Sequence, residues 1–115
     1  GLENPISITF LSIGGAFILA GIIMLIFPPK DINNVYGYRT RRSKSGKRAW
    51  DFAQKYSALR LIESGALGTI SGVLVLVFQP NISFALYLSL TFTLLAVCIA
   101  NTLFRTEAQL KKRRF

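Results

Sequence analysis

The sequence predicts an all-α integral membrane protein with three transmembrane helices, a cytoplasmic amphipathic helix at the interface, and its amino terminus outside. The 115 residues are 51% hydrophobic, yet the net charge is +9. The two kinds of residue are segregated, because no charge lies between Glu3 and Lys30 or from Ser64 through Phe104. A soluble domain of this size would interrupt such runs with polar residues. About 20 apolar residues cross a bilayer as a helix, so the longer second run predicts two crossings.

The first apolar segment, residues 6–27, is expected to be a spanning helix that ends at Pro28 and Pro29. A cleaved secretory signal is the alternative interpretation of this segment. Such a signal would need a basic start, a shorter apolar stretch and a small-residue cleavage site. Here the only charge before the run is Glu3. We therefore expect a membrane anchor that is retained.

Residues 30–57 are expected to form a polar cytoplasmic loop followed by an amphipathic helix. The loop favours turns over helix, and Ser43 or Ser45 can cap the helix that follows. Helical spacing places Trp50 and Tyr56 near one side, with Gln54 and other polar residues largely elsewhere. Such a helix suits the headgroup level of a bilayer, where tryptophan and tyrosine are enriched.

Two further spanning helices are expected at residues 58–78 and 82–104, joined by a turn at residues 79–81 and followed by a basic tail, residues 105–115. Arg60 and Glu63 are one helical turn apart and can form an ion pair at the start of the second span. The polar Asn101 is expected to face protein or headgroups rather than lipid. The whole chain is then a single membrane domain.

Small residues in the spanning segments suggest close helix packing. Ser12, Ala16 and Ala20 recur every four residues, and Gly68 with Gly72 forms a GxxxG pair. Such stripes let a neighbouring helix approach closely, and we also expect them to favour a homo-oligomer. The alternative is that glycine and alanine are simply frequent in membrane helices.

The charge distribution predicts the orientation. Residues 30–63 contain nine Lys/Arg and residues 105–115 contain five, whereas the amino-terminal stub and the turn at 79–81 contain none. Lysine and arginine concentrate in cytoplasmic loops. In the three-helix arrangement all fourteen lie on one side. This predicts an outside amino terminus and a cytoplasmic carboxyl terminus.

A cluster of specific side chains in the polar loop forms the candidate binding site. Its members are Asn33, Tyr36, Gly37, Tyr38, Arg39, Thr40 and Ser43, with Trp50 downstream. Arg39 with Thr40 and Ser43 could hold a phosphate or carboxylate by charge-assisted hydrogen bonds. Alternatively, Arg39 is structural and ties the loop to the helix ends by bonding backbone carbonyls or Asp51. Both interpretations are compatible with the spacing.

The same cluster carries a family resemblance. The stretch Pro28-Pro29-Lys30-x-Ile32-Asn33-x-x-Tyr36-Gly37-Tyr38-Arg39-Thr40-x-x-Ser43, with Trp50-x-x-Ala53 downstream, resembles the signature of the SdpI family. These are bacterial inner-membrane proteins named for immunity to a secreted killing factor. The resemblance implies toxin immunity or an envelope-stress role, with a toxin peptide or a cytoplasmic regulatory protein as partner. The chain looks like the family's carboxy-terminal three-helix unit, without the additional helices of its longer members.

Other functions are compatible with the residues to different degrees. An anionic-lipid or lipid-phosphate binding module, or a small transporter subunit, would use the same loop, since basic residues at helix ends attract membrane lipids. An enzyme is disfavoured by the lack of histidine and by scattered carboxylates. No metal-binding spacing occurs, and we expect no cofactor. A nucleic-acid partner is not expected, because the basic residues follow membrane topology.

Overall fold

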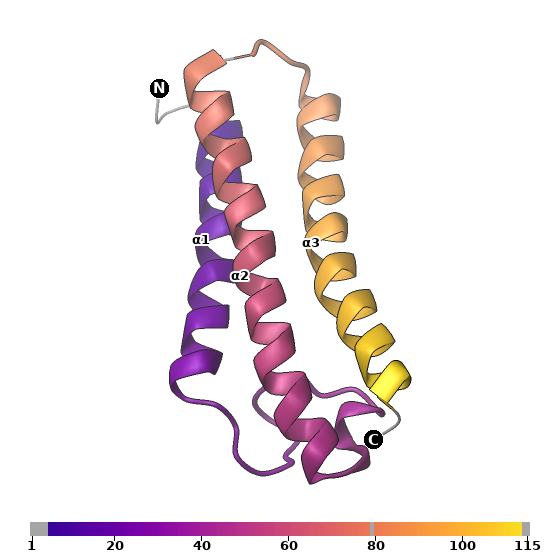
Figure 1. Ribbon diagram of the computed structural model, residues 1–115. Helices are drawn as coiled ribbons and strands as arrows, with labels where there is room; N and C mark the ends of the chain where they lie inside the picture. Colours follow the sequence, from indigo (N-terminus) through magenta and orange to yellow (C-terminus); the bar gives the residue numbers. More distant parts are fainter. Residues whose placement is uncertain (1–4, 79, 114–115) are drawn as a thin grey trace.

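The computed structural model describes residues 5–78 and 80–113, and their fold is all-α (Figure 1). The long helices are α1 (Pro5–Ile26), α2 (Lys47–Phe78) and α3 (Phe84–Arg113), and a short 3-10 helix, η1 (Ser43–Ser45), lies between α1 and α2. Each long helix has the length and hydropathy to cross a membrane. The predicted fold class of three such helices is therefore confirmed, and the chain is a multi-pass membrane protein.

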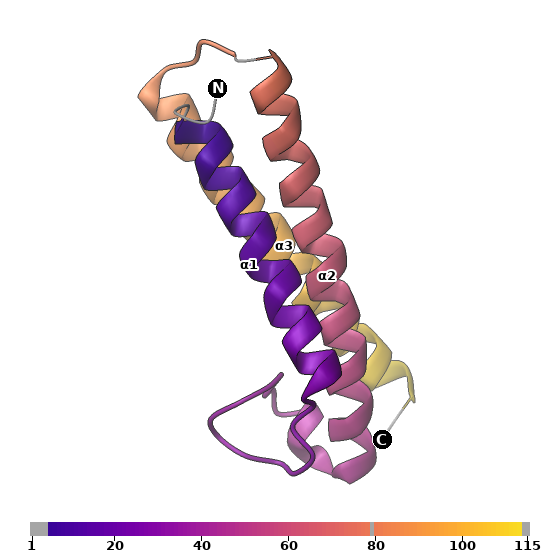
Figure 2. The same cartoon turned by 90° about the vertical axis from the view of Figure 1, so that its left-hand side faces the viewer.

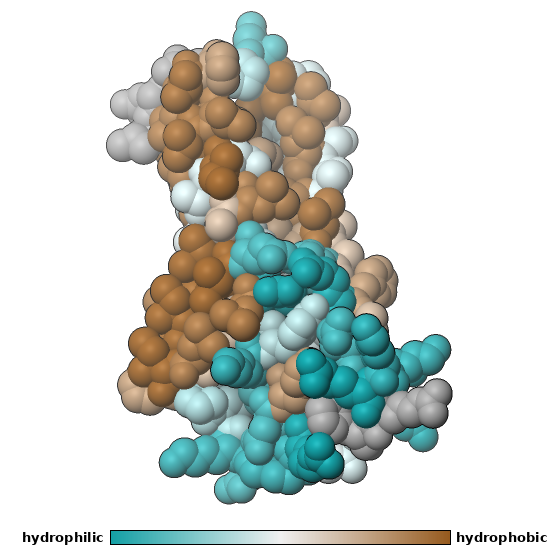
Figure 3. Space-filling model, viewed as in Figure 1, coloured by the Kyte–Doolittle hydropathy of each residue, from teal (hydrophilic) through white to brown (hydrophobic). Residues whose placement is uncertain are grey.

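The three helices run down, up and down, as Figures 1 and 2 show. One end of the bundle holds the start of α1 and the connection from α2 to α3. The other end holds the start of α2, the end of α3, and residues 27–46, which we call the motif loop. Hydrophilic residues gather at this second end, while brown hydrophobic residues cover most of the rest of the face shown in Figure 3. The longest dimension is 49 Å, so the molecule extends beyond a hydrocarbon core of about 30 Å.

The expected separate interfacial helix is absent from the described part of the chain. Residues 47–57 are instead the first turns of α2, which continues without a break to Phe78. The segment contains no proline or glycine that would interrupt the backbone hydrogen bonds. Likewise, α3 continues to Arg113, so residues 105–113 extend the helix rather than forming a separate tail. Gln79 of the expected turn and Arg114 of the basic tail lie outside the described residues.

Helices α1 and α2 touch through glycines. A Cβ added to Gly14 would lie 2.5 Å from the Thr69 backbone nitrogen, and one added to Gly65 would lie 2.6 Å from the Gly14 carbonyl oxygen. Gly68 and Gly72 belong to the same contact, where they face Gly14 and Leu11. Since α1 occupies this face, it is not open to a second copy of the chain as the sequence suggested.

The small-residue stripe predicted on α1 does not face α2. Ser12, Ala16 and Ala20 are exposed in the bundle, because the helix turns Gly14 toward α2 instead. The stripe therefore takes no part in the packing of α1 against α2. Its role in binding another copy stays a prediction.

Polar contacts fasten α3 to α2 beside the basic end. Asn101 donates to Ser64 Oγ at 2.9 Å and to Glu63 Oε1 at 3.1 Å. Glu63 also accepts from Arg105 and forms an ion pair with Arg60 at 3.7 Å. The expectations that Arg60 pairs with Glu63 and that Asn101 faces protein are confirmed. Near the opposite end α3 is joined to α1, where the hydroxyls of Thr9 and Tyr87 lie 2.6 Å apart.

Candidate functional site: the motif loop

The first part of the motif loop is a turn that closes the end of α1. Asn33 Oδ1 accepts from the backbone nitrogens of Val35 and Tyr36 at 2.9 and 2.7 Å, which is the side-chain turn that asparagine favours. The turn brings the Tyr36 hydroxyl to the carbonyl of Phe27, to which it donates at 2.7 Å. Carbonyls at a helix end have no intrahelical partner. Tyr36 therefore caps the carboxyl end of α1.

The centre of the loop lies across α2. Gln54 is buried, and its Oε1 accepts from the Tyr38 backbone nitrogen at 2.7 Å, while its Nε2 donates to the Tyr38 carbonyl at 2.8 Å. Gly37 precedes this contact with a φ of +105°, a conformation that favours glycine. A Cβ at this position would also lie 2.7 Å from Pro29 Cγ and 2.5 Å from Gln54 Oε1. Gly37 is thus required by both conformation and space.

The Tyr38 side chain reaches α3. Its hydroxyl donates to Glu107 Oε1 at 2.8 Å, and the other carboxylate oxygen of Glu107 pairs with Arg42 at 3.3 Å. Burial raises the pKa of the Tyr38 phenol far above its ordinary value, and the hydrogen bond to Glu107 and the charge of that carboxylate act in the same direction. The phenol is therefore a neutral donor at any physiological pH. It joins the loop to α3.

Thr40 and Ser43 form the last turn of the loop by reciprocal bonds. Ser43 Oγ accepts from the Thr40 nitrogen at 2.8 Å, and Thr40 Oγ1 accepts from the Ser43 nitrogen at 3.2 Å. The exchange of bonds has the pattern of a capping box, but it closes the turn of residues 40–43 that leads into η1, whose N-cap Arg42 forms no side-chain cap bond. The expectation that Ser43 or Ser45 caps the helix after the loop is wrong. Gly46 precedes α2, and Ser45 Oγ donates to the Arg42 carbonyl.

Trp50 is fully buried rather than part of an interfacial aromatic belt. Its Nε1 donates to the Pro29 carbonyl at 2.6 Å. A buried indole N–H needs an acceptor, and the end of α1 supplies a free carbonyl. Trp50 therefore fastens the end of α1 to the start of α2. Tyr56 is partly buried, with the Arg60 guanidinium 4.8 Å from its ring centre.

Arg39 is exposed and donates to the backbone carbonyl of Asn34 in the same loop. It therefore bonds a carbonyl, as the structural interpretation expected, but this carbonyl belongs to the loop rather than to a helix end. The grip on a phosphate by Arg39, Thr40 and Ser43 stays a prediction, and the contacts of Ser43 weigh against its part in it. Ser43 is 0% exposed, and its hydroxyl also faces the carbonyls of Tyr38 and Thr40 at 3.1 and 2.9 Å.

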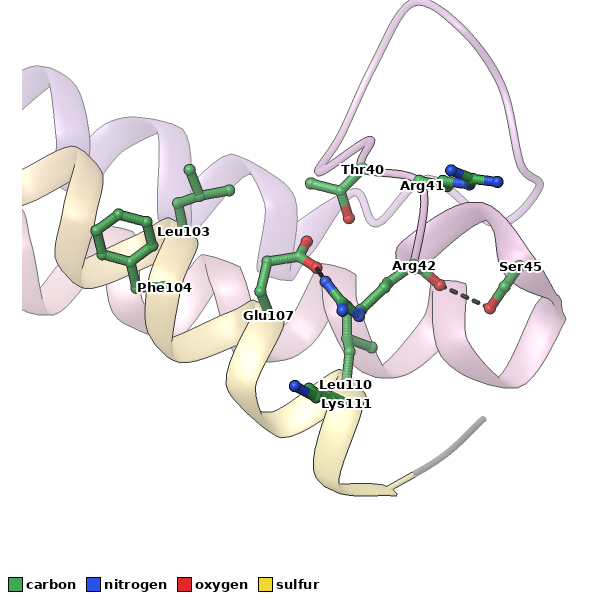
Figure 4. Close-up of a pocket in the computed structure, with 9 residues that line it drawn as sticks. All are labelled: Thr40, Arg41, Arg42, Ser45, Leu103, Phe104, Glu107, Leu110 and Lys111. Atoms are coloured by element: carbon green, nitrogen blue, oxygen red, sulfur yellow. Dashed lines mark hydrogen bonds and ion pairs between the residues drawn. The ribbon is translucent and has the colours of Figure 1, made fainter.

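A groove of about 950 Å³ lies beside the loop, against the last turns of α3 (Figure 4). We call it the basic groove. Figure 4 shows Arg42 reaching toward Glu107, with Leu103 and Phe104 farther along α3 toward its membrane-spanning part. The groove is lined by Thr40, Arg41, Arg42, Ser45, Leu103, Phe104, Glu107, Leu110 and Lys111.

Several residues of this site were missed by sequence reasoning. Gln54 was assigned to the polar side of the amphipathic helix, and Glu107 and Arg42 were not singled out. Gln54 follows Trp50 by four residues and so lies on the same helical face, which is the signal that could have revealed it. Glu107 carries no comparable signal, because only the packing of α3 brings it to Tyr38. Among the described residues, no group of three or more His, Cys, Asp or Glu residues could hold a metal.

The fold and the loop define a class of small helical membrane protein whose basic end is closed by an internally bonded loop across all three helices. The sequence model of the SdpI/YfhL protein family matches residues 30–104, which include most of the motif loop, all of α2 and most of α3. The chain belongs to this family.

A curated relative supports the assignment. The chain is 47% identical over 98 residues to the "Uncharacterized protein YfhL" of Bacillus subtilis (strain 168), and the match covers 85% of this chain and 82% of that protein. No solved structure matches this chain.

Proposed function

We propose that this protein is a non-enzymatic membrane protein of the immunity or envelope-stress type, which protects the cell against a secreted membrane-active peptide. The observation that carries the proposal is the family match over residues 30–104, because it includes the whole Tyr-Gly-Tyr-Arg-Thr segment together with α2, which holds it through Gln54. The family is named for immunity to a secreted killing factor, and a protein with three spanning helices lies in the membrane that such a peptide attacks.

The geometry of the motif loop supports a binding or shielding role over catalysis. The hydroxyl, amide and indole groups of the motif are bonded to backbone or to neighbouring helices, as for Tyr36, Tyr38 and Trp50. Catalytic groups must instead face a site where a substrate can lie. The side chains of the motif thus hold the three helices in one arrangement. The protective activity then resides in the helical bundle that the motif stabilises.

The proposed location is the bacterial cytoplasmic membrane, with the amino terminus outside and the motif loop in the cytoplasm. The support is the concentration of Lys and Arg at a single end of the bundle. In this orientation the opposite end, where Thr9 meets Tyr87, faces the outside. A secreted peptide would reach that end first. A cytoplasmic regulatory protein would instead meet the basic end.

The test is deletion of the gene in the native host, followed by exposure to a panel of membrane-active killing peptides. We expect the deletion strain to become sensitive to at least one peptide and wild-type protein to restore resistance. Gln54→Ala, which removes the link between loop and α2, should restore resistance poorly, whereas Lys55→Ala at the exposed neighbouring position should restore it fully. Membrane levels of each variant are measured by immunoblotting. Unchanged sensitivity of the deletion strain across the panel would overturn the proposal.

A further inference from the structure

The geometry points to a second site, in which the basic groove binds one anionic phospholipid, with Arg41 and Lys111 holding its phosphodiester and Phe104 contacting its acyl chain. This site is distinct from the Arg39 position considered from the sequence. It also does not depend on the immunity function, because it follows from the shape and charge of the groove.

The two sides of the groove differ in chemistry. The motif loop contributes Thr40, Arg41 and Arg42, and the last turns of α3 contribute Leu103, Phe104 and Lys111. The volume of about 950 Å³ exceeds what a headgroup needs and leaves room for the first part of an acyl chain. A phospholipid is the ligand that joins an anion and an alkyl chain in one molecule. A free phosphate would occupy only the polar side.

The charges in the groove leave a net positive site. Arg42 is paired with Glu107 at 3.3 Å, and Figure 4 shows its guanidinium directed at that carboxylate. Arg41 and Lys111 are both exposed, and within residues 5–78 and 80–113 neither forms an ion pair. Two cations are therefore available for an anionic headgroup. Figure 4 draws the exposed Arg41 side chain directed away from Glu107 and Lys111, so it would turn toward the groove to close over a ligand from the loop side.

The groove also lies at the depth of the lipid headgroups. The run without charge ends at Phe104, and Arg105 is the next residue. Phe104 is 68% exposed, so its ring is available to lipid. Lys111 lies two helical turns farther along α3, on the side of the basic end. Basic pockets between spanning helices at the cytoplasmic surface bind anionic headgroups.

The experiment uses the full chain in nanodiscs of phosphatidylcholine with phosphatidylglycerol or cardiolipin, with co-purified and added lipid measured by native mass spectrometry. We expect one tightly retained anionic lipid per chain. The Arg41→Gln/Lys111→Gln double variant should weaken its binding about tenfold or more. Phe104→Ser should weaken lipid binding without changing competition by glycerophosphoglycerol, which lacks acyl chains.

The matched control is Lys55→Gln/Lys112→Gln, which removes the same charge at exposed positions that do not line the groove. If the two double variants lost the same amount of anionic-lipid binding, the attraction would be a diffuse property of the basic surface, and the proposed site would be overturned. Retention of inorganic phosphate or glycerophosphoglycerol as tightly as lipid would overturn the assignment to a phospholipid. Retention of anionic lipid by the Arg41→Gln/Lys111→Gln variant at the wild-type level would overturn the proposal directly. Circular dichroism establishes that each variant is folded.

Discussion

The side-chain amide of Gln54 on α2 hydrogen-bonds both backbone groups of Tyr38 in the motif loop, at 2.7 and 2.8 Å. A neighbouring strand would pair a residue in the same way, so a single side chain substitutes for a backbone partner. Gln54 is only 2% exposed, and the loop it holds bonds the end of α1 through Tyr36 and α3 through Tyr38. The arrangement of three helices at the basic end therefore depends on one buried amide.

Gln54→Ala should be strongly destabilising. It leaves the backbone nitrogen of Tyr38 without its partner at a partly buried position, at a cost of about 1–3 kcal/mol, and leaves the carbonyl of Tyr38 with the Ser43 hydroxyl at 3.1 Å. Thermal unfolding in mild detergent, followed by circular dichroism, measures the change. Lys55→Ala is the control, because Lys55 is exposed at the next position of the same helix. Equal melting temperatures for the two variants would contradict the role assigned to Gln54.

Gly37→Ala and Gly46→Ala should differ sharply in their effect on the free energy of unfolding, although both residues lie in the motif loop. Gly37 has a φ of +105°, and a Cβ there would meet Pro29 and Gln54, whereas a Cβ at Gly46 would have nothing within 4 Å. The left-handed conformation alone costs about 1–2 kcal/mol for a residue with a Cβ. We expect Gly37→Ala to lower the free energy of unfolding by at least that amount and Gly46→Ala to leave it nearly unchanged.

The comparison of these two glycine variants is made by denaturant unfolding in the same detergent. A large effect of both substitutions would mean that the loop tolerates no added bulk anywhere, which would remove the specific argument for Gly37. A small effect of both would show that the loop relaxes around a left-handed alanine.

Trp50 gives a direct optical measure of the closed loop, because it is the only tryptophan in the chain. It is 0% exposed and donates to the Pro29 carbonyl, so its emission should be blue-shifted and poorly quenched by acrylamide. Gln54→Ala should increase the quenching by loosening the loop, whereas Arg39→Gln should not, since Arg39 contacts only the loop itself. A tryptophan at the bilayer interface would instead be quenched readily in the wild-type protein.

The three helices could be predicted from the sequence because each corresponds to a long uninterrupted apolar run. Charge is absent over long runs, and within a single segment only a helix satisfies its own backbone hydrogen bonds in lipid. The division of residues 47–78 into an interfacial helix and a spanning helix was wrong, because hydropathy changes near Ala58 while the backbone does not. A change in side-chain polarity marks the membrane boundary, but a helix ends only where its hydrogen bonds end.

The candidate site was predictable as a cluster but not as a set of contacts. Asn33 and Gly37 are turn residues whose conformations follow from their own chemistry. The partners of Tyr38 and Trp50 are Glu107 and Pro29, which are distant in sequence. Their proximity results from how the helices pack, and a single sequence carries no signal for it. The clustering suggested ligand binding, whereas the contacts assign most of these side chains to holding the helix ends together.

Gly14→Ala and Gly15→Ala test the contact between α1 and α2 with adjacent residues, of which only Gly14 faces α2. A Cβ at Gly14 would lie 2.5 Å from the Thr69 nitrogen and 2.7 Å from the Gly65 carbonyl oxygen, whereas one at Gly15 would meet nothing within 4 Å. Since backbone atoms cannot rotate away, Gly14→Ala must separate the helices, at a cost of about 1–3 kcal/mol. Gly15→Ala should be neutral or slightly stabilising, because alanine favours helix. Unfolding in a series of increasing dodecyl sulfate concentrations measures both variants, and equal midpoints would show that α1 and α2 are not packed through Gly14.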